Sequence, residues 1–188
     1  MKKLVSFAFV AAVALPMFAQ MTDDVEDVKI LPREERKRES NVWPAFLAVS
    51  EFPASPDIIG LRLTIPFSTV QENITGIDLG LWGRSIYFQG IQVSVLRNDV
   101  KDDMSGFQVG LYNTVGGGQL LGLQAGLFNE ANSMRGAQIG LVNLGGEVQG
   151  FQIGLINRCE TMVGYQIGLI NVIRDNELQF CPILNIGW

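Results

Sequence analysis

Histidine is absent from this chain of 188 residues, and only two cysteines occur. Without histidine, Ser/His/Asp and Cys/His catalysis and the usual zinc ligand sets are excluded. Cys159 lies in a connector and Cys181 in the last apolar segment. The sequence leaves open whether they form a disulfide or stay apart, one exposed and one packed as a small hydrophobe. No residue identifies a reaction, and we expect no enzyme activity, cofactor or metal site.

Charge is also scarce, since Asp, Glu, Lys and Arg make up 18% of the chain and the formal net charge is −5. The basic residues between Arg33 and Glu39 alternate with acidic ones. A nucleic-acid partner would favour a basic surface, so we predict none. The acidic stretch from Asn98 to Asp103 contains Lys101, and no calcium-binding pattern accompanies it. We interpret it as a solvated turn.

The first 20 residues have the pattern of a secretory signal peptide. Lys2 and Lys3 precede an uncharged apolar run, and Ala19 is a small residue suited to cleavage. Residues 21–42 are rich in charge and poor in apolar side chains, which is typical of a solvated linker. The sequence therefore predicts an exported protein of the bacterial cell envelope, with residues 43–188 as its folded domain.

The chain instead contains one short sequence motif that recurs many times. It occurs five times in nearly the same form, as FQVGLYN, LQAGLFN, AQIGLVN, FQIGLIN and YQIGLIN, with the glutamine at 108, 124, 138, 152 and 166. Weaker copies place Arg62, Asp78 and Gln92 at the same position. Fixed spacing of about 14 residues is the signature of a repeat architecture. Because the two charged members are adjacent and opposite in sign, we expect an ion pair between neighbouring strands.

Each repeat alternates with a period of two, which predicts a β-strand. Side chains alternate between the two faces of a strand, so Phe151, Ile153 and Leu155 lie on one face, and Gln152 and Ile156 on the other. The repeated strands after Gly106 carry no charge. We therefore expect the Phe/Ile/Leu face to be covered and to form the core.

Two all-β architectures fit one strand per repeat. The units are either coils of a parallel β-solenoid or successive strands of an antiparallel meander that closes into a barrel. Successive units are equivalent one by one, and the apolar face is only three side chains wide, or ~13 Å when tilted, against ~25 Å for a membrane barrel. Both observations favour the solenoid. The terminal aromatic Trp188 favours the barrel, although Pro182 interrupts that last strand.

The repeats resemble a family of uncharacterised bacterial surface-repeat proteins built from Gly-Leu-Gln-Ile-Gly-Leu-Val-Asn type units. The residues that carry the resemblance are those from Gly150 to Asn157, the openings at Gly60 and Gly76, and the close from Cys181 to Trp188. The likeness covers about residues 43–188. It implies export and an envelope location, and it transfers no catalytic or binding residues.

Asparagine recurs at the end of each repeat, at positions that include Asn143, Asn157 and Asn171. A short amide at a strand exit can satisfy backbone groups that a bend leaves without partners. We predict that these three side chains form a structural ladder.

The glutamine-bearing face also carries a glycine column and an apolar column, which include Gly140, Gly154, Gly168, Val142, Ile156 and Ile170. If the Phe/Ile/Leu side is the core, this face points outward, and exposed apolar stripes usually mark a contact. We therefore predict an interaction face there. The alternative is that another part of the same chain covers it.

The sequence thus favours a structural or interaction protein of the envelope, without catalysis. An outer-membrane barrel or small pore and a carbohydrate- or peptide-binding ladder are the alternatives. Its partner is an envelope component or a second copy of itself, and membrane association stays open.

Overall fold

The computed structural model describes residues 45–49, 57–65 and 71–188, all within one compact unit, Val42–Trp188. The predicted signal peptide (1–20) and the predicted linker (21–42) lie outside the described residues. Every regular element in the described ranges is a β-strand, so they contain no helix that could cross a membrane.

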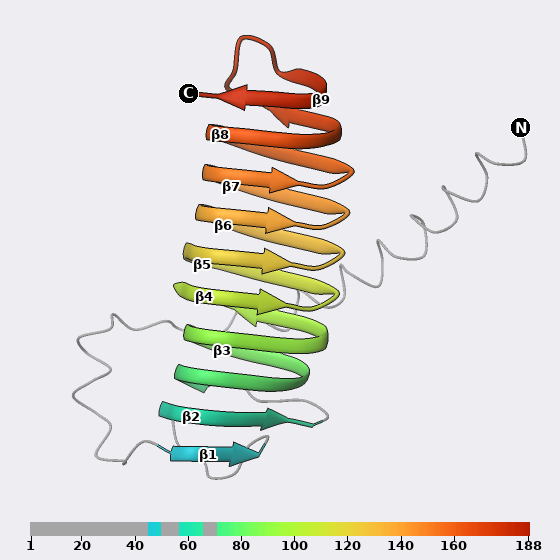
Figure 1. Ribbon diagram of the computed structural model, residues 1–188. Coiled ribbons are helices and arrows are strands. Elements are labelled where there is room, and N and C mark those ends of the chain that lie inside the picture. Colours follow the sequence, from blue (N-terminus) through green and yellow to red (C-terminus); the bar gives the residue numbers. More distant parts are fainter. Residues whose placement is uncertain (1–44, 50–56, 66–70) are drawn as a thin grey trace, which may run out of the picture. The chain divides into compact units, whose positions relative to one another are not determined.

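Nine strands stack in chain order along one axis (Figure 1). They are β1 (Ala45–Val49), β2 (Asp57–Thr64), β3 (Gln71–Val100), β4 (Met104–Val109), β5 (Tyr112–Ala125), β6 (Phe128–Ile139), β7 (Val142–Ile153), β8 (Ile156–Ile173) and β9 (Phe180–Gly187). Strands β1 to β8 pair in parallel. The chain is a β-solenoid of about eight turns with roughly 14 residues per turn, which confirms the predicted solenoid over the meander.

Equivalent residues of successive repeats lie directly opposite one another. Gln152 pairs with Gln166, and Phe151 pairs with Tyr165, across β7 and β8. The rings of Phe151 and Tyr165 stack with their centroids 5.7 Å apart. Because parallel register repeats the same residue at each level, one amino-acid type forms a continuous column along the stack.

Glycine two residues before each glutamine allows the coils to approach closely. Gly164 has φ of +144°, and a Cβ there would lie 1.9 Å from the carbonyl oxygen of Gly150. A larger residue would therefore be strained by its backbone and would collide with the coil below. The recurring glycine thus sets the close stacking of this side of the coil.

The inside and the outside of the coil are the reverse of our expectation. Phe151, Ile153 and Leu155 are 47%, 39% and 49% exposed, whereas Gln152 is fully buried. The prediction that the Phe/Ile/Leu face forms the core is therefore wrong. Strand alternation separates the two faces correctly, but it does not say which one points inward. Here the buried amides hydrogen-bond to one another, which removes the usual penalty for placing polar groups inside.

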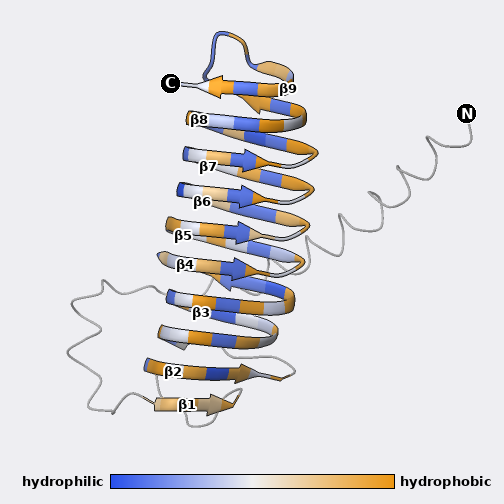
Figure 2. Ribbon diagram, in the orientation of Figure 1, coloured by the Kyte–Doolittle hydropathy of each residue, from blue (hydrophilic) through white to orange (hydrophobic). Residues whose placement is uncertain are grey.

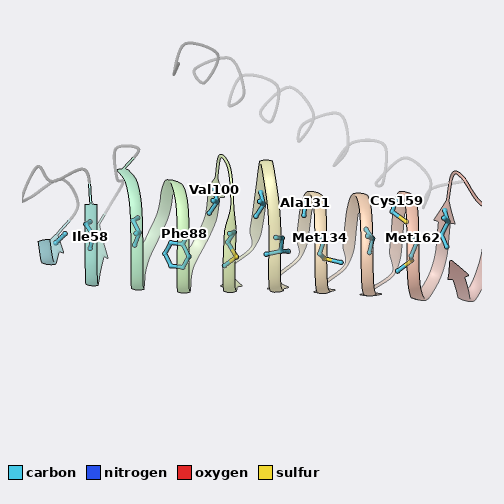
Figure 3. Packing of buried hydrophobic residues seen from close by; sticks show 14 of the residues in the cluster. Ile58, Phe88, Val100, Ala131, Met134, Cys159 and Met162 are labelled. Atoms are coloured by element: carbon cyan, nitrogen blue, oxygen red, sulfur yellow. The ribbon is translucent and has the colours of Figure 1, made fainter. Parts of the chain in front are cut away.

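The apolar core consists of two narrow columns that face each other inside the coil (Figure 3). One column holds the residue four positions before each glutamine, and the other the residue two positions after each asparagine. Their buried members are Ile58, Ile74, Phe88, Met104, Leu120, Met134, Val148 and Met162 in the first, and Val100, Val115, Ala131, Cys159 and Ile173 in the second. The Gln and Asn columns fill the rest of the interior.

Strand β9 closes the C-terminal end of the stack in the opposite direction. It pairs antiparallel with β8, with Asn185 opposite Gln166. Ile183, next to Pro182, has φ of 73°, which is unfavourable for a β-branched residue. The antiparallel strand interrupts the repeated pattern, so β9 acts as a cap rather than as a further coil.

Candidate functional site: amide ladders beneath an apolar face

A glutamine ladder runs through the interior of the stack. The Nε2 of each glutamine donates to the Oε1 of the glutamine one coil earlier, from Gln166 to Gln152 at 2.8 Å and onward to Gln92. Gln166 Nε2 also donates to the carbonyl oxygen of Val172, 3.2 Å away. All six side chains are buried. The donors therefore all point toward the N-terminal end of the stack.

The glutamine ladder ends on a buried ion pair. Gln92 Nε2 donates to Asp78 Oδ2 at 3.0 Å, and Arg62 Nε donates to Asp78 Oδ1 at 2.9 Å. Thr64 Oγ1 donates to the same carboxylate, and Arg62 Nη1 donates to the carbonyl oxygen of Arg84. The predicted Arg62–Asp78 ion pair is confirmed. With the bond from Arg62 Nη2 to Asp78 Oδ2, four charge-assisted hydrogen bonds to one carboxylate compensate for its complete removal from water.

The asparagines form a second ladder whose donors point the other way. Asn143 Nδ2 donates to Asn157 Oδ1 at 2.8 Å, and Asn157 Nδ2 donates to Asn171 Oδ1 at 2.7 Å. The same donor atom of Asn157 also bonds the carbonyl oxygen of Ile167 at 2.9 Å. All three side chains are fully buried. They bond both their neighbours and the backbone at the bend between the two sides of the coil.

The glycines predicted within an interaction face do not form an exposed strip. A Cβ on Gly154 would lie 2.3 Å from the carbonyl oxygen of Gly140 and 2.7 Å from Asn143 Nδ2. These positions point at the asparagine ladder, at the corner of the coil. Of the apolar residues beside them, Ile156 and Ile170 are exposed and Val142 is half-buried.

The large exposed surface lies on the side of the coil that was expected to be the core. We call it the apolar face, and it consists of the residues one before, one after and three after each position of the glutamine column. From Arg62 to Gln166 every such residue is apolar or aromatic. Its exposed members include Ile77, Leu79, Leu81, Ile91, Val93, Val95, Phe107, Val109, Leu111, Leu127, Ile139, Leu141, Phe151, Ile153, Leu155, Tyr165, Ile167 and Leu169. Figure 2 shows the resulting alternation of hydrophobic and hydrophilic residues along each coil.

Charged residues pair with one another outside the apolar face. Arg174 Nη1 lies 3.0 Å from Glu160 Oε1 on the exposed surface, and Lys101 Nζ lies 3.0 Å from Asp99 Oδ2. Lys101 thus neutralises part of the acidic connector that follows Asn98. Among the described residues, no group of acidic and cysteine side chains is arranged to hold a metal ion.

An aromatic and cationic ridge lies beside these charges. The Arg97 guanidinium stands 4.8 Å from the ring centre of Tyr112, and Arg84 stands 4.5 Å from that of Trp82. Tyr112 donates from its hydroxyl to Glu130 at 3.0 Å. Burial, followed by the negative charge of Glu130, raises the pKa of Tyr112 to about 12. These contacts join side chains of neighbouring coils, which assigns the ridge a role in stabilising the stack.

Both cysteines are free thiols. Cys159 is buried and its Sγ accepts a hydrogen bond from Gln166 Nε2, 3.2 Å away. Burial raises the pKa of Cys159 to about 12, with a smaller contribution from the charge of Glu160. A thiol that stays protonated is a poor nucleophile, so Cys159 serves as part of the core.

Sequence reasoning identified the amide columns and missed the core column that lies four residues before each glutamine. The signal was present, because this position reads Ile, Ile, Phe, Met, Leu, Met, Val, Met from residue 58 to residue 162. Comparison with protein-family models, curated proteins and solved structures finds no match to this chain. The fold and the two ladders define its class, which is a short-coil β-solenoid whose interior combines amide ladders with a narrow apolar core, and which has an apolar outer face.

Proposed function

We propose that this chain is an exported structural or interaction protein of the bacterial cell envelope, which acts by docking through its apolar face and performs no catalysis. The observation that carries the proposal is the column three residues after each position of the glutamine column, where every side chain from Ile65 to Leu169 is an exposed Ile, Val or Leu. A soluble protein keeps such a surface only where something covers it for part of its working life.

The size of the apolar face supports a docking role. Eight coils at ~4.8 Å each extend it over ~38 Å, and four residue steps at ~3.3 Å give a width of ~13 Å. The projected area is on the order of 500 Å², within the range in which the largest apolar patch on a protein is often functional. The charged residues lie elsewhere, so desolvating this face leaves no unpaired charge behind.

The proposed location rests on the predicted signal peptide and on the resemblance to bacterial surface-repeat proteins. The buried ladders support the docking role, because they hold the coil rigid. Each glutamine and asparagine has one dominant set of partners, so the outer columns stay aligned along the stack. The chain is then a rigid support whose contact surface is the apolar face.

Cell fractionation of an expressing bacterium tests the proposal. We expect the wild-type chain in the envelope fraction, and we expect the double variant Ile139→Lys/Ile153→Lys in the soluble exported fraction. The matched control is Leu144→Lys, because Leu144 is an exposed hydrophobe outside the apolar face, in register with Arg158 of the next coil. Envelope retention of the double variant, or cytoplasmic retention of the wild-type chain, contradicts the proposal.

A further inference from the structure

We propose that the apolar face is covered by the same face of a second copy of this chain, so that two solenoids form a face-to-face dimer. This inference rests on the proposed function and names the partner of that surface. The two outer sheets would pack as the layers of a β-sandwich do, at a separation of about 10 Å.

The pattern of the face suits a sheet that packs on its own copy. Each coil presents one residue before and one after the glutamine column, for example Phe151 and Ile153, and the next coil presents Tyr165 and Ile167 in register. Such columns form parallel ridges with a groove between them. A two-fold axis in the plane of the interface lets the ridges of one copy enter the grooves of the other, as an isologous contact requires.

The charge distribution favours a second copy over a lipid surface. Segments that lie on anionic bilayers carry Lys and Arg around their apolar side. This chain has a net charge of −5, and the apolar face carries no charge of its own. The exposed charges of Glu160, in β8, and Arg174, which follows β8, pair with each other outside the apolar face. Two copies can therefore meet at this face without bringing like charges together.

The area is of the size that a dimer needs. Two faces of ~500 Å² in projection remove ~1,000 Å² of flat surface, and side-chain ridges make the accessible area larger than its projection. Specific interfaces bury about 1,200–2,000 Å² in total, so complete overlap of the two faces reaches this range.

The cap extends the face and fixes its length. Ile186 of β9 pairs with Tyr165, and Leu184 pairs with Ile167, and both are exposed. The apolar columns thus continue onto β9 although that strand runs in the opposite direction. Because the cap ends the stack, the face has a defined length and a dimer of two such faces is closed.

Sedimentation equilibrium and light scattering of the exported chain test the inference. We expect twice the chain mass for the wild type, and the mass of one chain for Ile139→Lys/Ile153→Lys at the same concentration. Leu144→Lys should stay dimeric. Circular dichroism establishes that each variant keeps its β structure, which is expected because all three side chains point outward. If the double variant does not fold, Phe107→Ser/Val109→Ser tests the same apolar face without introducing charge.

A monomeric wild-type chain, or a dimer that survives in folded variants of both kinds, overturns the inference. Flotation with neutral and with anionic lipid vesicles tests whether lipid, rather than a second copy, covers the apolar face. A chain that floats with vesicles and is monomeric in solution identifies lipid as the partner and overturns the dimer. Its envelope retention would still support the proposed function. Conversely, a wild-type dimer that is absent from the envelope fraction supports this inference while refuting the proposed function.

Discussion

Arg62 Nε donates to Asp78 Oδ1 across 2.9 Å, although both side chains are completely buried. The pair lies in line with the glutamine ladder and ends it, since the Asp78 carboxylate accepts the last amide hydrogen bond, from Gln92. In the described part of the glutamine column, an arginine and a carboxylate thus replace two glutamines in successive repeats.

Breaking this pair on one side should be costly. We expect Arg62→Leu to lower the free energy of unfolding by ~3–5 kcal/mol, because it leaves Asp78 charged and buried without its main partner. The double variant Arg62→Gln/Asp78→Gln should be much closer to the wild type, since it extends the amide ladder. Urea titration measures both, and Arg174→Ala, which breaks an exposed pair with Glu160, should cost less than ~1 kcal/mol. Equal losses of unfolding free energy for the single and double variants would show that an unpaired buried charge is not the cause of the destabilisation.

The asparagine ladder can be tested one residue at a time. We expect Asn157→Ala to cost ~1–3 kcal/mol, because it strands the amide of Asn143 and the carbonyl oxygen of Ile167 in the interior. Asn132→Ala is the matched control, since Asn132 is the same residue type on the surface. Chemical denaturation measures the difference between them. Similar midpoints for the two variants would mean that the ladder contributes nothing measurable.

Stability should fall in alkaline solution. The pKa of Cys159 is raised to about 12, from its ordinary value of 9.0, and that of Tyr112 to about 12, from 10.0. In the unfolded chain both groups lose their protons first, so the unfolded state binds fewer protons between these values. The contribution of Cys159 is complete below pH 9 and is lost as the pH rises toward 12.

Thermal unfolding at a series of pH values measures this loss, and Cys159→Ala should weaken its dependence on pH between about 9 and 12. Mass spectrometry after treatment with iodoacetamide at pH 9.5 provides a second readout. We expect Cys159 to be modified in the denatured chain and protected in the folded one. Rapid modification of Cys159 in the folded chain would contradict its assignment to the core.

Removal of the cap should expose an edge that can pair. A chain ending at Gln179 lacks β9 and leaves the outer edge of β8 and the Oε1 of Gln166 uncovered. Unpaired strand edges promote association, and solenoids need their terminal caps for solubility. We expect concentration-dependent growth beyond a dimer in sedimentation velocity, with the full-length chain as control.

Cap removal is best tested in the Ile139→Lys/Ile153→Lys background, so that association through the apolar face does not obscure association through the edge. A truncated chain that keeps the mass of the capped variant at every concentration would show that β9 is not what prevents end-to-end pairing.

Much of the fold could be predicted from the spacing of a few residues. The glutamines at 138, 152 and 166 predict a coil of 14 residues, and the structure places them directly above one another. The opposite charges of Arg62 and Asp78 predict their ion pair. These features depend only on how successive coils align. Because the units are nearly identical, only one alignment places the same residue type at the same position of every coil.

The choice of interior could not be predicted in the same way. Alternation assigns Gln152 and Ile153 to opposite faces, but hydrophobicity alone puts the isoleucine inside. The structure instead buries the glutamine, because a column of primary amides can satisfy its own donors and acceptors from coil to coil. The direction of β9 was equally hidden, since apolar residues alternate in the same way along parallel and antiparallel strands.

The two ladders also set the rule by which such a molecule can change its length. In every coil from Gln124 to Gln166 the glutamine donates to the preceding coil, and the asparagine donates to the following one. Gain or loss of one complete unit therefore leaves no amide without its counterpart, whether the unit has 14 residues, as between Gln138 and Gln152, or 16, as between Gln108 and Gln124. Duplication of the gene segment that encodes one unit would lengthen the apolar face by one coil. Binding strength could therefore evolve through the number of coils, without a change in the contact that each coil makes.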